Sequence, residues 1–298
     1  MWLATRPQIK QHHVRRGRVG SWCFALAVIL AGVTTGPANA NATSVPQRVV
    51  SLNLCTDQLA MLLAAPGQLH SVSYLAAQPN TSVLADKADA YVINHGLAEE
   101  VFLMRPDLIL AGTFTTRATI TLLKRLKFRV VEFPPANSFA DIETNVRRMG
   151  DLLDRRGAAR KMIAAMRHEL GALSKSEKRQ ALTALYYANS YTSGGNTLAS
   201  EIVRRAGLVN LGDRLGLSGT TRLPLELLVL GKPELVVKGR RFGDGKSRAT
   251  EVLEHPALTA ATKTSTHALL SDRYWICGAP FTLQAVRNLV RAARAVAR

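Results

Sequence analysis

Two glutamates stand at matched positions of the chain and are its most distinctive candidates for binding chemistry. Glu99 lies seven residues before Pro106, and Glu226 lies seven residues before Pro233. A carboxylate can accept a bidentate hydrogen bond from a guanidinium group. A single glutamate in the first turn of a helix can instead serve only to complement the helix dipole. The matched pair favours the binding role.

Both glutamates belong to a sequence motif that occurs twice in the chain, called the repeated motif below. Residues 99–112 and 226–239 carry Glu, Pro and Gly at the same places, with no gap in either copy. Each copy reads as a short apolar helix, a proline that ends it, an acidic residue, and a buried strand closed by glycine. A helix-to-strand unit that recurs in this way predicts two similar lobes.

The rest of the chain alternates between strand-like and helix-like segments, as an α/β fold with mostly parallel sheets requires. In the first half we expect strands at 48–53, 69–74, 107–111 and 129–133 and helices at 56–64, 98–104 and 115–126. Two helices follow, at 139–155 and 158–173. In the second half we expect strands at 182–188 and 234–238 and helices at 197–206, 223–230 and 283–296. The sequence thus predicts a first lobe over 43–156, a long backbone helix over 157–176 that joins the lobes, and a second lobe over 177–298.

The first 42 residues have the pattern of a secretory signal peptide. Basic residues between Arg6 and Arg18 precede an apolar run from Trp22 to Val33, and small residues follow at 38–42. The apolar run is too short to cross about 30 Å of hydrocarbon. We therefore expect export to the periplasm and cleavage near residue 40 or 42, rather than a membrane anchor.

The charge of the chain favours anionic partners. The chain has 39 Lys and Arg against 21 Asp and Glu, and removal of the first 42 residues leaves 34 basic residues and a net charge near +13. The basic residues are spread over the predicted helices, and aromatic residues are scarce around them. This pattern is typical of solvated helix faces and argues against a nucleic-acid-binding surface.

Cys55 and Cys277 are the two cysteines that remain after signal cleavage. In an oxidising compartment two thiols more often pair than stay free. Each lies on a loop that follows a predicted strand or precedes the last helix, so a disulfide would tie the two lobes together. The alternative is that each is a small core residue, because the sequence does not show whether their Cα atoms come within about 7 Å.

No motif for catalysis or for a resident metal ion or cofactor is found. The histidines of the mature chain have no close spacing of the kind that metal ligands show, and they are His70, His95, His168, His255 and His267. The sequence also lacks the Gly-x-Ser-x-Gly motif of hydrolases. We therefore predict neither a catalytic residue nor a metal site.

Five segments in the right order make the chain resemble the periplasmic substrate-binding proteins of ABC importers for ferric siderophores, haem and cobalamin, the helical-backbone group. They are residues 48–52, Glu99 with 106–110, 191–197 with 206–210, Glu226 with Pro233, and 275–280. The resemblance covers nearly all of the mature chain. It implies a ligand cleft between the two lobes.

The resemblance also implies a partner. In that family one exposed glutamate of each lobe docks on arginines of the two subunits of an inner-membrane permease. By position this role falls on Glu99 and Glu226, with Glu100 as the open alternative in the first lobe. We expect the protein to act as a monomer that binds a metal chelate and this permease dimer.

Ligand-binding residues are expected on the loops at the carboxyl ends of the strands, where α/β sheets present their ligands. Aromatic side chains there can stack on a planar chelator, and arginines can neutralise its carboxylates or catecholates. Tyr74, Arg240 and Trp275 are the preferred candidates. The other candidates are Asn53, Leu54, Thr56, Asn94, His95, Thr113, Phe114, Tyr191, Ser193, Arg241, Phe242, Arg273 and Tyr274.

These features together predict a periplasmic receptor that captures a metal chelate and delivers it to an ABC permease, with no chemical step of its own. The positive charge favours a ferric siderophore over cobalamin, and haem remains possible. A periplasmic enzyme or a sensory protein on the same two-lobed scaffold is the alternative.

Overall fold

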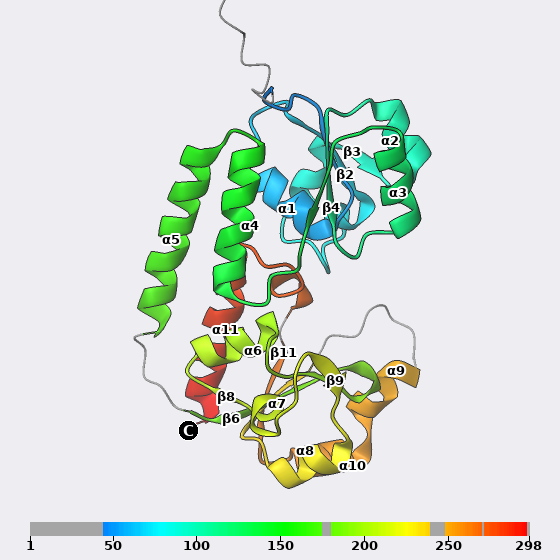
Figure 1. Cartoon of the computed structure of the whole chain (residues 1–298). Helices are drawn as coiled ribbons and strands as arrows, with labels where there is room; N and C mark the ends of the chain where they lie inside the picture. Colours follow the sequence, from blue (N-terminus) through cyan, green and yellow to red (C-terminus); the bar gives the residue numbers. More distant parts are fainter. Residues whose placement is uncertain (1–43, 175–179, 239–247, 270, 297–298) are drawn as a thin grey trace, which may run out of the picture. The chain divides into compact units, whose positions relative to one another are not determined.

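The computed structural model describes residues 44–174, 180–238, 248–269 and 271–296 (Figure 1). Residues 44–298 form one compact unit. The expected signal peptide, residues 1–42, lies outside the described residues. None of the helices in the described part of the chain is long and apolar enough to cross a membrane.

The first lobe is built on a parallel sheet with strand order β3-β2-β1-β4-β5. Its strands are β1 (Val49–Ser51), β2 (Leu69–Ser73), β3 (Val92–Asn94), β4 (Leu108–Gly112) and β5 (Val130–Phe133), and its helices are α1 (Leu54–Leu63), α2 (Ala98–Met104) and α3 (Arg117–Arg125). Along β4 the side chains alternate between two apolar clusters: Leu108 and Leu110 join one, and Ile109 and Ala111 join the other. Burial on both faces explains why this strand reads as an unbroken apolar run.

Two helices follow the first sheet and pack side by side (Figure 1). They are α4 (Phe139–Leu152) and α5 (Arg156–Ser174), the second of which is the predicted backbone helix. Ser138 caps α4 by accepting a hydrogen bond from the backbone N–H of Asp141 at 3.1 Å. Gly150 permits the close approach of the helices, because a Cβ at this position would lie 2.5 Å from the Cβ of Ala159. The helix α4 ends three residues earlier than we predicted, which makes room for the sharp turn into α5.

The second lobe holds a parallel sheet with strand order β11-β10-β6-β8, beside an antiparallel pair of β7 and β9. The strands are β6 (Leu182–Tyr186), β7 (Tyr191–Ser193), β8 (Val209–Asn210), β9 (Thr220–Arg222), β10 (Leu235–Lys238) and β11 (Thr266–Leu269). The helices are α6 (Leu198–Arg205), α7 (Leu211–Arg214), α8 (Leu225–Gly231), α9 (Arg248–Glu251), α10 (Pro256–Ala261) and α11 (Leu283–Val296). The predicted class of two α/β lobes with parallel sheets is confirmed.

The repeated motif forms the same helix-to-strand unit in both lobes, namely α2 with β4 and α8 with β10. It ends α2 at Arg105 and α8 at Lys232, which both adopt the left-handed conformation, with φ/ψ of 49°/55° and 46°/57°. A proline follows each of them, and then β4 or β10 begins in a matching place, beside β1 in one sheet and beside β6 in the other. The two lobes therefore share the order β2-β1-β4-β5 and β8-β6-β10-β11.

The acidic residue after each proline ties the repeated strand to its neighbour. Asp107 accepts a hydrogen bond from the backbone N–H of Arg48 at 3.0 Å and donates its own N–H to the carbonyl oxygen of Arg48. Glu234 makes the same pair of contacts with Leu182. Its side chain accepts a hydrogen bond from the backbone N–H of Leu182 at 3.0 Å, and its own N–H donates to the carbonyl oxygen of Leu182 at 2.8 Å. The acid thus sets where the central pair of parallel strands begins in each sheet.

Candidate ligand site and docking surface

A cavity of about 220 Å³ lies at the carboxyl ends of β1, β4 and β5. Four of the predicted ligand residues line it, namely Asn53, Thr56, Thr113 and Phe114. Its lining is largely apolar, with Pro134 and Pro135 after β5 and Ile276 before the last helix. Such a lining suits a ligand with an apolar or aromatic face.

The first turn of α1 forms the polar side of this cavity. Asn53 is the N-cap of α1, and its side-chain oxygen accepts the N–H of Cys55 at 3.0 Å. The side chain of Asn53 also lies against Gly112, where a Cβ would come within 2.9 Å of it. The hydroxyl of Thr56 is 2.9 Å from the carbonyl oxygen of Asn53 and 2.8 Å from the hydroxyl of Ser51. Asn53 therefore remains a ligand candidate, whereas Thr56 is buried and contributes mainly to the turn.

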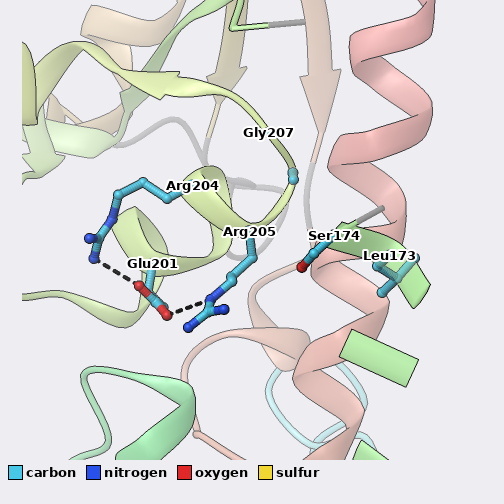
Figure 2. A pocket seen from close by; sticks show the side chains of 7 residues that line it. Leu173, Ser174, Glu201, Arg204, Arg205 and Gly207 are labelled. Carbon is cyan, nitrogen blue, oxygen red and sulfur yellow. Dashed lines mark hydrogen bonds and ion pairs between the residues drawn. The ribbon is translucent and has the colours of Figure 1, made fainter. Parts of the chain in front are cut away.

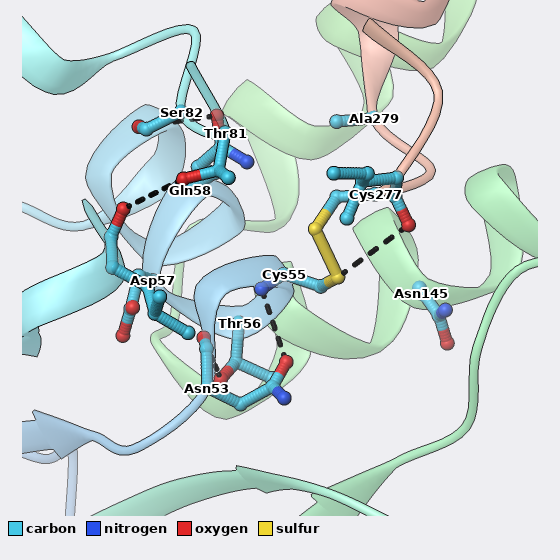
Figure 3. Close-up of a disulfide and its surroundings, with 12 residues drawn as sticks. Asn53, Cys55, Thr56, Asp57, Gln58, Thr81, Ser82, Asn145, Cys277 and Ala279 are labelled. Atoms are coloured by element: carbon cyan, nitrogen blue, oxygen red, sulfur yellow. Dashed lines mark hydrogen bonds between the residues drawn. A yellow bond between two sulfur atoms is a disulfide. The ribbon is translucent and has the colours of Figure 1, made fainter. Parts of the chain in front are cut away.

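Cys55 and Cys277 form a disulfide at the edge of the cavity (Figure 3). Their Cα atoms lie 5.0 Å apart, although 222 positions separate them in the sequence. The segment that carries Cys277 packs against the first lobe, since a Cβ on Gly278 would lie 2.4 Å from the Cβ of Ala136 and 2.8 Å from Cγ1 of Ile142. The bridge therefore fastens the segment before α11 to the first turn of α1.

Tyr74 and His95 form an exposed aromatic pair that follows β2 and β3. Their ring centroids are 5.7 Å apart, and the ring planes are inclined by 18°. Glu100 holds His95 in place, because its carboxylate accepts the backbone N–H of His95 at 2.7 Å and lies 3.1 Å from Nδ1. These contacts, above all the backbone hydrogen bond, lower the pKa of Glu100. The pair offers a flat face and a phenolic oxygen to a ligand.

Besides Thr56, four predicted ligand residues are buried, and their assignment as ligand contacts is corrected. Asn94 is fully buried: its amide donates to the carbonyl oxygen of Ser51 and the hydroxyl of Ser71, and its oxygen accepts the N–H of Gly96. Leu54, Ser193 and Trp275 are buried as well. These residues were predicted because they lie near the ends of strands, but their side chains point into the protein.

The remaining candidates lie in the second lobe or next to α11. Arg273 donates a hydrogen bond to the hydroxyl of Tyr274 at 3.0 Å, and its guanidinium lies 4.9 Å from the centre of the same ring. Tyr191 is partly exposed and lies under the guanidinium of Arg222. Arg240, Arg241 and Phe242 lie outside the described residues.

The cavity is also lined by residues that were not among the expected ligand contacts, namely Pro134, Pro135, Asn145 and Ile276. The two prolines directly follow β5, so the same strand-end argument could have nominated them. Ile276 is exposed although it is apolar, and that signal is visible only in the structure. No group of three or more His, Cys, Asp or Glu is arranged to hold a metal ion in the part of the chain that the structure describes.

Asp57 is the fully buried carboxyl group of α1 and directly follows Thr56, which lines the cavity (Figure 3). The hydroxyl of Ser73 donates to its carboxylate. Burial raises the pKa of Asp57 from 3.8 to about 7, and hydrogen bonds to Ser51 and Ser73 only partly oppose this rise. The folded protein therefore holds this proton in a range of pH where the unfolded chain has lost it.

We expect Asp57 to make the protein less stable as the pH rises from about 4 to about 7, because only the unfolded chain ionises freely in that range. The stabilisation by the retained proton is complete below about pH 4 and is lost above about pH 7, at a cost of up to about 4 kcal/mol. Asp57→Asn keeps the shape and an acceptor for Ser73 but does not titrate. Urea unfolding at pH 4 to 8 should show a flatter stability profile for this variant than for the wild type and for the exposed-site control Asp86→Asn. Parallel profiles for Asp57→Asn and the wild type would contradict the assignment.

The two matched glutamates are exposed on the first turns of α2 and α8. Among the described residues neither Glu99 nor Glu226 has a hydrogen-bond or ion-pair partner. Glu100, by contrast, interacts with both the backbone N–H and the ring of His95. The geometry thus leaves Glu99 as the freer of the two acids in the first lobe.

A second hollow, of about 310 Å³, lies between the end of α5 and α6 and is lined by two arginines (Figure 2). Glu201 pairs with both of them, at 2.8 Å to Arg204 and 2.8 Å to Arg205. Because Glu201 and Asp213 together offset the positive charge of the two arginines, the hollow is a weaker candidate for an anionic ligand than the cavity at the strand ends.

A family model described as "Periplasmic binding protein" matches residues 49–272, which is most of the chain. The chain belongs to the periplasmic binding protein family. A search of curated protein sequences found no match. The family assignment agrees with the resemblance inferred from the five sequence segments, and the family consists of binding proteins.

Solved structures of periplasmic binding proteins share this fold. The heme-binding protein RhuT from Roseiflexus sp. RS-1 has a TM-score of 0.70 at 17% identity, over 85% of this chain and 99% of that one. A possible iron-binding protein from Staphylococcus epidermidis ATCC 12228 gives 0.69 at 17%, over 83% and 98%. The vitamin B12 binding protein BtuF of Vibrio cholerae gives 0.64 at 18%, over 85% and 99%. At such low identity the likeness concerns the fold alone.

Proposed function

We propose that this periplasmic binding protein captures a metal chelate at the strand-end cavity and delivers it to an inner-membrane ABC permease. The observation that carries the proposal is the pair Glu99 and Glu226, which occupy the same exposed place on two copies of one element. Two equal anionic contacts suit a partner with two similar halves, and the structural relatives are described as binding iron, heme or vitamin B12.

The ligand side of the proposal rests on the aromatic surface at the strand ends. Tyr74 and His95 present a flat exposed pair, and Phe114 is 86% exposed at the rim of the cavity. Exposed aromatic side chains stack on planar or ring-containing ligands. Together with the net charge near +13 of residues 43–298, they favour an anionic ferric siderophore, with haem and cobalamin as the other members of the class. The iron would be cargo, held by its chelator.

A fluorescence titration tests this proposal directly. Trp275 is the only tryptophan in residues 43–298, and it directly precedes Ile276 in the cavity lining. Ferric enterobactin, ferrichrome, haemin and cyanocobalamin are suitable probes, since each can quench a nearby indole. We expect a ferric siderophore to bind most tightly. Tight binding of cyanocobalamin alone would overturn the siderophore preference, and binding of none of the four would contradict the chelate proposal.

The aromatic contribution can be measured in the same titration. Tyr74→Ala and Phe114→Ala should each raise the Kd of the bound chelate about tenfold, because each removes an exposed ring that would stack on the ligand. Phe102→Ala is the matched control, since Phe102 is also an exposed ring but lies on α2, away from the strand ends. An equal effect of all three substitutions would show that the strand-end rings have no special role.

A further inference from the structure

The repeated element carries a second matched feature beside the glutamates. Leu103 is 78% exposed at the end of α2, and Leu230, the residue 127 positions later, is 75% exposed at the same place on α8. Glu99 and Glu226 are separated by the same 127 positions. A single exposed leucine needs no explanation. Two leucines with nearly equal exposure at equivalent sites of two copies do need one.

The geometry of the helices places each leucine beside its glutamate. Glu99 and Leu103 are four residues apart, as are Glu226 and Leu230, so each pair lies on one helix face with Cβ atoms roughly 5–6 Å apart. The intervening Val101 and Leu228 are fully buried and fix which side of each helix faces inward. Each helix therefore presents a carboxylate followed, one turn later, by a large apolar side chain.

Structural roles within the chain do not account for these leucines. A hydrophobic residue in the last turn of a helix can pack against the residues that follow a left-handed C-cap. Both helices end in such a cap, at Arg105 and Lys232. With three quarters or more of their surface exposed, however, Leu103 and Leu230 make little of this contact. Exposed apolar side chains at such places are typical of surfaces that another protein covers.

We propose that Leu103 and Leu230 are a second pair of permease contacts, each inserting into an apolar socket beside the basic residue that receives the neighbouring glutamate. The inference rests on the proposed delivery of a chelate to an ABC permease. The partner that covers these leucines is a pair of similar permease subunits. Each lobe presents the same glutamate and leucine, so each fits the same basic and apolar site on one subunit. In this arrangement the glutamates raise the association rate and orient the protein on the permease, and the leucines lower the dissociation rate of the complex.

The test uses spheroplasts of a strain that lacks the chromosomal gene, supplied with purified protein and with the radioactive form of whichever of the four probes binds. The half-saturating concentration of added protein then measures its affinity for the permease. Leu103→Ser should raise this concentration roughly tenfold, and the double variant with Leu230→Ser roughly a hundredfold. Chelate affinity and thermal stability should stay at the wild-type level. Leu103→Met with Leu230→Met should restore most of the activity.

A matched control removes two exposed leucines elsewhere. Leu126 and Leu215 are 45% and 38% exposed, one in each lobe, and Leu126→Ser with Leu215→Ser should leave the half-saturating concentration unchanged. If the Leu103/Leu230 variants behave like this control while the glutamate variants lose uptake, the leucine inference is wrong and the delivery function stands. If wild-type protein supports no uptake, the proposed function itself fails. If sedimentation shows that the wild type dimerises through these leucines, the occupant is a second copy of this chain and the inference is overturned.

Discussion

Replacing Glu99 and Glu226 together by alanine is expected to abolish uptake of the chelate while leaving its binding intact. Both carboxylates are exposed, and neither has a partner among the residues that the structure describes. Their removal should therefore cost the fold only the small helix-dipole interaction of a first-turn acid, about 0.3–1 kcal/mol each. In a docked complex, each of these carboxylates would accept a bidentate pair of hydrogen bonds from an arginine of the permease. Loss of one such interfacial contact typically weakens a complex by about 2 kcal/mol, or roughly 30-fold.

The double variant should thus weaken docking about a thousandfold, whereas each single variant should be partly active. The control is Asp86→Ala with Asp89→Ala, which removes the same charge from exposed acids of the first lobe. A loss of uptake in this control would indicate general electrostatic attraction instead of two specific contacts. Wild-type uptake by the glutamate double variant would overturn the docking assignment.

The variant Glu100→Ala separates the two adjacent acids of the first lobe. Because Glu100 bonds to both the backbone and the ring of His95, its removal should disturb the Tyr74–His95 pair and with it chelate affinity. Removal of Glu99 should change only docking. The two neighbouring residues are thus expected to give opposite patterns in the titration and in the uptake assay.

The sequence alone predicted the fold well where the pattern was long or repeated. The copies around Pro106 and Pro233 predicted α2 with β4 and α8 with β10, and the apolar periodicity predicted α11 with both ends correct. The missed strands β3, β7, β8, β9 and β11 have only two to four residues each. In so short a segment neither alternation nor an apolar run can develop, and pairing with neighbours decides the structure.

The candidate site was less predictable because it depends on the direction of side chains. Asn94 and His95 are adjacent at the end of β3, yet Asn94 is fully buried in a hydrogen-bond network and His95 is exposed. Position at a strand end identifies the loop but not which of its residues faces the ligand. The role of Asp107 and Glu234 was also hidden, since the N–H groups that they accept belong to segments distant in the sequence.

Removal of the disulfide should have the largest effect on stability. In the unfolded chain the bridge between Cys55 and Cys277 closes a loop over 222 positions, so it restricts most of residues 44–298. Loss of a native disulfide costs about 2–5 kcal/mol. We expect Cys55→Ala with Cys277→Ala to lower Tm by about 6–12 °C, a range that corresponds to about 3 kcal/mol in a protein of this size.

Thermal unfolding in the presence and absence of dithiothreitol measures this contribution. The reductant should lower the Tm of the wild type toward that of the double variant and should leave the double variant unchanged. Thiol titration of the unfolded protein comprising residues 43–298 should find no free thiol before reduction. Because the bridge also holds Ile276 at the cavity next to Asn53, the double variant should bind the chelate more weakly, even at temperatures where it is fully folded. An unchanged Tm together with an unchanged Kd would mean that packing of Gly278 against Ala136 and Ile142 is sufficient to hold this segment without a covalent bond.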